Sequence, residues 1–157
     1  MITIPKRYSQ LDWRWRWKRV GNYSNFGRVG CTTTALSMLL EVLEYDFTPP
    51  QVEEKINKVG GYLMTKEGPT GLLIWSKIEK AFPKVKFIYR YYAYNNSKVL
   101  SIIKVAKMPV LVEVRHPSGT KHWTLFIGDR LAIDPLGGSI ISTGKYPVLG
   151  FTELART

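Results

Sequence analysis

The pattern of apolar residues changes near the middle of this chain, from the spacing of helices to that of strands. From Thr32 to Tyr45, apolar side chains cover most of the circumference of a helix, as expected for a buried central helix. From Val85 to Tyr94, and again in short segments after Pro109, β-branched and aromatic residues dominate. Helices followed by an antiparallel sheet predict an α+β fold.

Length and apolar content bound the organisation of the chain. With 157 residues, 45% of them apolar, and no internal repeat or long linker, residues 1–157 are expected to form a single, monomeric domain. No apolar run approaches the ~18 residues of a membrane span. The start of the chain, MITIPKRYSQ, lacks the apolar stretch of a secretory signal, so we expect synthesis in the cytoplasm without Sec-type export.

Smaller signals place the remaining elements. Thr48, followed by two prolines, should cap a second helix over QVEEKINKV, and GLLIWSKIEKAF is typical of a third helix, which would end at Pro83. Asn96 or Ser97 should cap a helix that runs to Lys107. Four short strand candidates, separated by Gly, Pro or Asp, follow: PVLVEVRH, HWTLFIG, LAIDP and SIIS.

The N-terminal part of the chain is strongly basic and rich in tryptophan. The formal net charge is +11, and residues 1–30 hold seven Lys and Arg against one acidic residue, Asp12. Between residues 8 and 19, Trp alternates with Arg and Lys, which predicts an extended segment with Trp13 to Trp17 packed on the core and the cations in water. The same pattern also suits a lipid interface or stacking on nucleic-acid bases.

This charge favours polyanionic partners, namely nucleic acid, anionic lipid or an acidic cell-wall polymer. Nucleic acid has the least support of the three, because the sequence contains no recognised nucleic-acid-binding motif.

A lone cysteine, Cys31, stands where a Gly-rich loop meets the most apolar helix. A single cysteine excludes an internal disulfide, and with only His116 and His122 beside it the usual Cys/His zinc site is excluded too, so we expect no metal and no cofactor. At a helix N-terminus, the dipole and the unpaired N–H groups favour the thiolate, which is the nucleophilic form. The alternative is a cysteine that only fills space as a small apolar side chain.

A nucleophilic cysteine needs a base, and the chain offers two histidines. His122 begins the apolar segment HWTLFIG, where a strand would hold its ring in place. His116 precedes Pro-Ser-Gly, a turn signature, and should project toward solvent. We therefore favour His122 as the base.

Asp134, at the end of LAID, is the candidate to orient that imidazole. A three-residue loop at residues 127–129 would place His122 directly opposite Asp134, whereas a two-residue turn would put them on opposite faces of the sheet. The pairing therefore requires an odd-length loop or a bulge. The backbone N–H of Cys31 and the side-chain amide of Gln10 are the candidates to stabilise an oxyanion.

In this order, these residues resemble the papain-fold cysteine peptidases, and more closely the branch of bacteriocin-processing (double-glycine leader) peptidases. Gln10, Asp12 and Trp15 match the opening Gln-x-Asp-x-x-Trp of that branch, and GCTTTALSMLL, HWTLFIG and AIDPLGG resemble its other motifs. The resemblance spans residues 8–138. The chain departs from the family at Thr32–Thr33, where relatives often have a small residue and proline, and we expect no transporter domain and no coupled export of a leader peptide.

The resemblance implies a papain-like domain with Cys31 as nucleophile, His122 as general base and acid, Asp134 as orienting residue and Gln10 as oxyanion donor. Such a site hydrolyses peptide or amide bonds, and the same triad can also transfer an acyl group to an amine. The expected substrate is peptidoglycan, because the positive charge would concentrate the protein on an anionic cell wall. The protein would reach the wall by a non-Sec route, as phage-type lysins do, although a cytoplasmic peptidase fits equally well. The alternative function is a catalytically silent papain-fold binding module that grips an acidic polymer.

Overall fold

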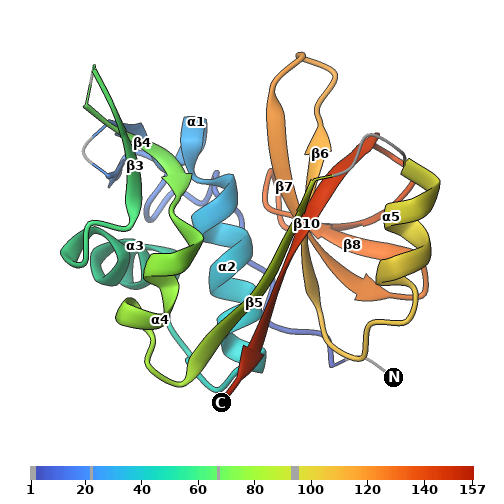
Figure 1. The fold of residues 1–157 in the computed structure, drawn as a ribbon. Helices are drawn as coiled ribbons and strands as arrows, with labels where there is room; N and C mark the ends of the chain where they lie inside the picture. The colour runs from blue at the N-terminus through green and yellow to red at the C-terminus, as the bar shows by residue number, and fades with distance from the viewer. Residues whose placement is uncertain (1–2, 22, 67, 93–95) are drawn as a thin grey trace.

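The computed structural model describes residues 3–21, 23–66, 68–92 and 96–157. It confirms the mixed architecture of helices and antiparallel strands: most of the helices lie on one side of a sheet, and one helix lies on the other side (Figure 1). The helices are α1 (Phe26–Val29), α2 (Cys31–Val42), α3 (Pro49–Lys58), α4 (Ile78–Ala81) and α5 (Asn96–Ile103), with a short 3₁₀ turn at Trp75–Lys77.

The main sheet has six strands in the order β5-β10-β6-β7-β8-β9, and all neighbours are antiparallel. Its strands are β5 (Val85–Tyr92), β6 (Val110–Arg115), β7 (Lys121–Gly128), β8 (Leu131–Asp134), β9 (Ser139–Ser142) and β10 (Val148–Arg156). Two hairpins pair β1 (Arg19–Val20) with β2 (Ser24–Asn25) and β3 (Tyr62–Thr65) with β4 (Gly68–Leu73).

The strands predicted in the second half are confirmed, with one omission. All four segments predicted after Pro109 form strands, and the strand predicted from Val85 is present to Tyr92, whereas residues 93–94 lie outside the described residues. Residues 148–156 carried no predicted strand, yet they form β10, which lies between β5 and β6.

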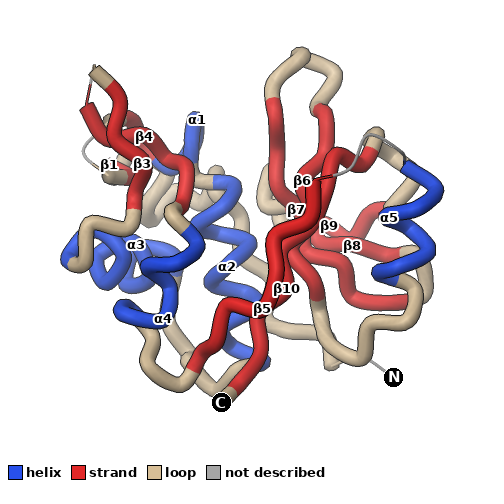
Figure 2. Tube along the Cα trace, viewed as in Figure 1, coloured by secondary structure: helices blue, strands red, loops and turns tan. Residues whose placement is uncertain are grey.

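The two faces of the sheet are covered by different helices, which explains why its central strands are apolar on both sides. Trp123, Leu125 and Ile127 of β7 belong to the core shared with α2, a helix whose residues 32–40 are all buried. Phe126, which points to the opposite face, packs in a second core with Ile103 of α5. In Figure 2, α2 and α5 lie on either side of the central strands.

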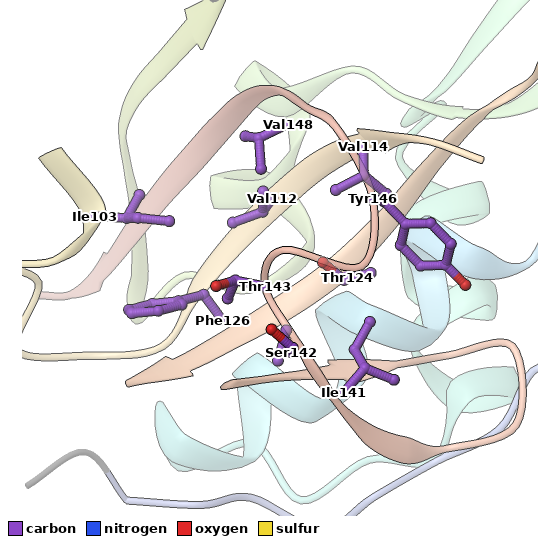
Figure 3. A pocket seen from close by; sticks show the side chains of 11 residues that line it. Ile103, Val112, Val114, Thr124, Phe126, Ile141, Ser142, Thr143, Tyr146 and Val148 are labelled. Carbon is purple, nitrogen blue, oxygen red and sulfur yellow. The ribbon is translucent and has the colours of Figure 1, made fainter. Parts of the chain in front are cut away.

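A small pocket lies in this second core. Ile103, Phe126 and Tyr146 are among its lining residues (Figure 3). Its cavity of about 10 Å³ is at the lower limit for a single water molecule, so we assign no ligand to it.

The tryptophan-rich segment is not extended, which corrects the prediction made from its alternation. The backbone N–H groups of Trp15 and Arg16 both bond to the carbonyl of Asp12, so the chain runs through successive turns. Alternate residues therefore do not share a face: Trp15 is 4% exposed, whereas Trp13 and Trp17 are 84% and 73% exposed. The prediction that all three tryptophans pack on the core is wrong.

Two predicted helices also differ. The segment predicted as a third helix begins as β4, because it pairs with β3, and becomes helical only from Trp75. A Cβ at Gly71 would lie 2.7 Å from the carbonyl oxygen of Val29, so β4 passes α1 at a distance that requires glycine. Helix α5 ends at Ile103 instead of Lys107, since a tight turn follows it.

Candidate active site

Cys31 is the first residue of α2, as predicted. The preceding residue, Gly30, supplies no side chain to cap the helix, so the thiol lies next to the unpaired N–H groups and the positive end of the helix dipole. Cys31 is half-buried, its sulfur is 3.8 Å from the hydroxyl oxygen of Thr32, and the backbone N–H of Trp123 helps to lower the pKa of the thiol. Each of these contacts favours the thiolate.

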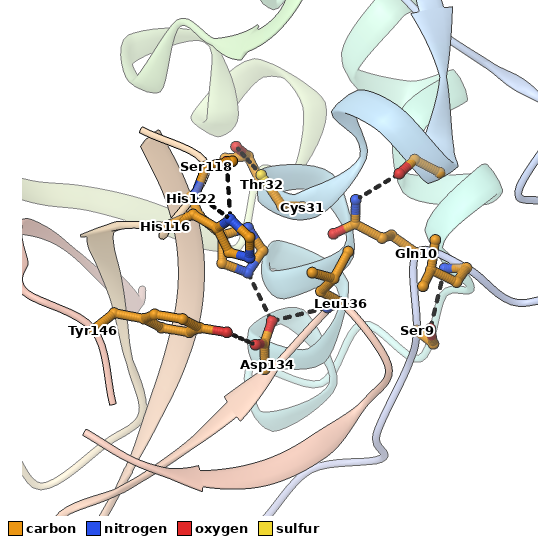
Figure 4. Close-up of polar contacts among 12 residues, drawn as sticks. Ser9, Gln10, Cys31, Thr32, His116, Ser118, His122, Asp134, Leu136 and Tyr146 are labelled. Atoms are coloured by element: carbon orange, nitrogen blue, oxygen red, sulfur yellow. Dashed lines mark hydrogen bonds and ion pairs between the residues drawn. The ribbon is translucent and has the colours of Figure 1, made fainter. Parts of the chain in front are cut away.

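His122 of β7 and Asp134 of β8 are buried and form the second part of the site (Figure 4). His122 Nε2 is 2.7 Å from Asp134 Oδ1. Two further donors fix the carboxylate: the backbone N–H of Leu136, 2.9 Å from Oδ1, and the hydroxyl of Tyr146, 2.9 Å from Oδ2. The His122 ring lies close enough to Cys31 for each group to shift the pKa of the other, and Nδ1 is the nitrogen not used by Asp134.

The turn between β7 and β8 differs from the one that would place the pair directly opposite. Asp129 and Arg130 form a two-residue turn with positive φ angles of 50° and 60°, the combination that a type I′ turn requires. A perfect ladder from such a turn would put His122 and Asp134 on opposite faces of the sheet.

A bulge at Ile127 restores the shared face. Phe126 pairs with Ala132, but Gly128 pairs with Leu131, so Ile127 is one extra residue in β7. Of the two arrangements that would allow the pairing, an odd-length loop or a bulge, the structure has the bulge.

The surroundings of these side chains set their charges. Burial raises the pKa of the Cys31 thiol, but the hydrogen bond and charge of His122, together with the backbone N–H of Trp123, outweigh burial and lower the pKa overall. Burial lowers the pKa of His122, but hydrogen bonds to Asp134 and Cys31 raise it to about 9. Burial also opposes ionisation of Asp134, yet the hydrogen bond from His122 holds its pKa below the usual value. The favoured charge state is thiolate, imidazolium and carboxylate.

Gln10 is buried near this site, with 3% of its surface exposed, but its amide N–H groups are already used. Nε2 donates to the carbonyl oxygens of Phe26 and Gly27, at 3.3 and 3.2 Å. Oε1 has no hydrogen-bond partner among the described residues and lies on the side of His122 in Figure 4. The role of oxyanion donor stays a prediction, and it requires the amide to rotate so that Nε2 points into the site.

Two further residues near the site, His116 and Tyr146, differ from what the sequence predicted. His116 does not project into solvent: it is half-buried, with its ring centroid 5.8 Å from that of His122 and 5.6 Å from that of Tyr146. Its Nδ1 is 2.9 Å from the hydroxyl oxygen of Ser118, whereas the Asp134 carboxylate is hydrogen bonded to His122. No spacing or motif in the sequence identifies Tyr146 as a partner of Asp134.

A cleft of about 290 Å³ opens onto Cys31. Its lining includes Thr70 and Leu72 of β4, Thr120 just before β7, and Lys121 and Trp123 of β7. A chain bound in this cleft has access to the sulfur.

Comparisons with family models, with curated proteins and with solved structures gave no match for this chain. Within the described ranges, no three or more His, Cys, Asp and Glu side chains gather where they could hold a metal ion. No helix in the described part of the chain has both the length and the apolar character needed to cross a membrane.

Proposed function

We propose that the chain is a cysteine peptidase or amidase with Cys31, His122 and Asp134 as its catalytic triad. The proposal rests on one arrangement: a thiol at the start of a helix meets an imidazole whose other nitrogen is fixed by a buried carboxylate. The lowered pKa of Cys31 and the raised pKa of His122 support it, because they favour the reactive ion pair.

The reaction follows from this charge state. The Cys31 thiolate attacks the carbonyl carbon of an amide, and protonated His122 gives its proton to the leaving nitrogen as the C–N bond breaks. This step releases an amine and leaves a thioester on Cys31. Neutral His122 then takes a proton from the attacking water, and collapse of the second intermediate frees a carboxylic acid and restores the thiolate–imidazolium pair. Asp134 holds the ring throughout, and the N–H of Cys31 is the nearest candidate to donate to the oxyanion.

A papain-like fold is part of the same proposal. The helix that carries the cysteine packs on an antiparallel sheet, and two neighbouring strands of that sheet carry His122 and Asp134. This arrangement agrees with the resemblance noted in the sequence.

For the substrate, we propose the peptide or amide bonds of bacterial peptidoglycan. The net charge of +11 supports this choice, since it attracts the protein to an anionic wall in a salt-dependent way.

The test incubates isolated peptidoglycan with the wild type, Cys31→Ala, His122→Ala and His116→Ala, and analyses soluble products by mass spectrometry. New amine termini should appear with the wild type and with His116→Ala, and be lost in the other two variants. If the wall stays intact while a panel of small peptides is cleaved, the proposed substrate is wrong and the proposed peptidase chemistry is still supported. If nothing is cleaved and the thiol titrates normally, the chain is not a cysteine peptidase.

A second candidate is a catalytically silent module that binds an acidic polymer through the N-terminal segment. The exposure of Trp13 and Trp17 favours it, as does the guanidinium of Arg16, which lies 4.9 Å from the centroid of the Trp17 ring. Such a module should sediment with isolated walls, be released by salt, and bind equally well as Cys31→Ala.

A further inference from the structure

Two positively charged side chains, Arg28 and Lys121, line the cleft that contains Cys31. Arg28 lies in the last turn of α1, three residues before Cys31, and Lys121 is the first residue of β7, next to His122. Both side chains are exposed. No Asp or Glu is among the described residues that line the cleft.

Neither cation has an assigned role within the fold. In the described part of the chain, neither Arg28 nor Lys121 makes an ion pair, whereas Lys6, Arg14, Arg90 and Arg156 all do. Neither of them is among the groups with the largest effects on the Cys31 pKa, which are burial, His122, Trp123 and Thr32. Their charges therefore remain available to a ligand.

The catalytic thiolate makes these charges useful. A substrate that brings a carboxylate close to an anionic sulfur is repelled by it, and the repulsion is strong where the surroundings exclude water. Cations in the same cleft offset that repulsion and can add charge-assisted hydrogen bonds to the carboxylate. The rest of the lining carries no charge and mixes polar with apolar residues, among them Thr70, Leu72 and Trp123, which suits a peptide-like chain.

We propose that Arg28 and Lys121 select substrates that carry carboxylate groups close to the scissile bond. This inference rests on the proposed peptidase function and narrows its substrate class to acidic peptides.

The first experiment digests a proteome-derived peptide library with the wild type and identifies the cleaved bonds by mass spectrometry. Asp and Glu should be enriched next to the cleaved bonds. The best-cleaved peptide is then synthesised in two forms, one with its glutamate or aspartate and one with the matching amide. The wild type should cleave the acidic form at least fivefold faster by kcat/KM, and the preference should shrink as salt is raised.

The variants Arg28→Gln and Lys121→Gln assign the preference to these residues. Each should lower kcat/KM for the acidic peptide about fivefold and leave that for the amide peptide within about twofold. Lys86→Gln is the matched control, because it removes one exposed charge from β5, outside the cleft.

The two proposals fail in different ways. If the acidic and amide peptides are cleaved equally, or if both cleft variants match Lys86→Gln, the selection by Arg28 and Lys121 is wrong while Cys31-dependent cleavage stands. If no peptide is cleaved in a Cys31-dependent way, the peptidase function is wrong and this inference falls with it.

Discussion

His122 and Asp134 are hydrogen bonded at 2.7 Å, although the register of β7 and β8 does not place them opposite each other. Leu125 pairs with Ile133, so the position across from Asp134 is Thr124, and His122 is its diagonal neighbour on the same face. Diagonal neighbours on one face of an antiparallel pair remain within reach of long side chains. The geometry of the site therefore depends on the bulge in β7, several residues away.

The charge state of Cys31 leads to the first prediction. Because its pKa is lowered, iodoacetamide should alkylate the wild type near pH 6, where a thiol with an ordinary pKa of about 8.5 is nearly inert. In His122→Ala the main stabiliser of the thiolate is lost, so alkylation should be slow at pH 6 and should become fast only as the pH approaches that ordinary pKa. The pH dependence of alkylation, followed by intact mass, measures both. Equal and slow alkylation of the two proteins at pH 6 would contradict an activated cysteine.

The pH profile of activity should have an alkaline limit set by His122. The active form needs a protonated ring, which exists below the His122 pKa of about 9, so kcat/KM should fall as the pH rises through that value. Asp134→Asn removes the carboxylate that raises this pKa, so the limit should move to lower pH. The loss in kcat should be on the order of 10²–10⁴. An unchanged alkaline limit in Asp134→Asn would show that Asp134 does not act on His122.

Tyr146 should contribute as a positioning residue. Its hydroxyl donates to Asp134 Oδ2 and helps to lower the pKa of that carboxyl group. In Tyr146→Phe the carboxylate loses this donor and holds the His122 ring less firmly, so kcat/KM should fall roughly tenfold. Tyr89→Phe, at an exposed position of β5, is the matched control. A loss of stability with unchanged kcat/KM would leave Tyr146 with a structural role only.

The reactive residues could be predicted because their signals are local. The position of Cys31 is predicted by a Gly-rich loop before an apolar helix. His122 and Asp134 are predicted by the strand patterns and by the rule that alternate residues of a strand share one face of the sheet. That rule required a bulge or an odd-length loop, but it could not choose between them. The choice depends on whether Asp129 and Arg130 both adopt positive φ, which no short-range pattern of this sequence specifies.

The features that were missed depend on contacts between distant segments. Tyr146 reaches Asp134 only after the strands have paired. Residues 148–156 become a strand because β5 and β6 hydrogen bond on either side of them. The apolar run around Leu72 suits a helix or a strand equally, and pairing with β3 decides for the strand. Long-range pairing of this kind is not encoded in periodicity.

Gln10 gives a prediction that separates catalysis from thiol activation. If its amide rotates to stabilise the oxyanion, Gln10→Ala should lower kcat on the order of 10²–10³. The alkylation rate of Cys31 should stay unchanged, since Gln10 is not among the groups with the largest effects on the thiol pKa. Full activity in Gln10→Ala would remove the role, and the N–H of Cys31 would then be the remaining candidate donor.

The three tryptophans of the N-terminal segment should differ sharply in their effect on stability. Trp15 is buried and its indole N–H donates to the carbonyl of Ser9 at 2.8 Å, so Trp15→Ala should cost about 3–5 kcal/mol of unfolding free energy. Trp13→Ala and Trp17→Ala remove exposed rings and should each change it by less than about 0.5 kcal/mol. Urea denaturation at constant m-value measures all three.

The same variants separate folding from surface binding. If the exposed tryptophans contact the cell wall, the double variant Trp13→Ala/Trp17→Ala should bind isolated walls less tightly than the wild type while keeping its urea midpoint and its peptide cleavage rate. Equal destabilisation by all three single variants would contradict the turn seen in this segment, because it would mean that the tryptophans share one buried face as in an extended strand. Unchanged wall binding in the double variant would show that Trp13 and Trp17 do not contact the wall, and the segment would then act only through the burial of Trp15 in the core.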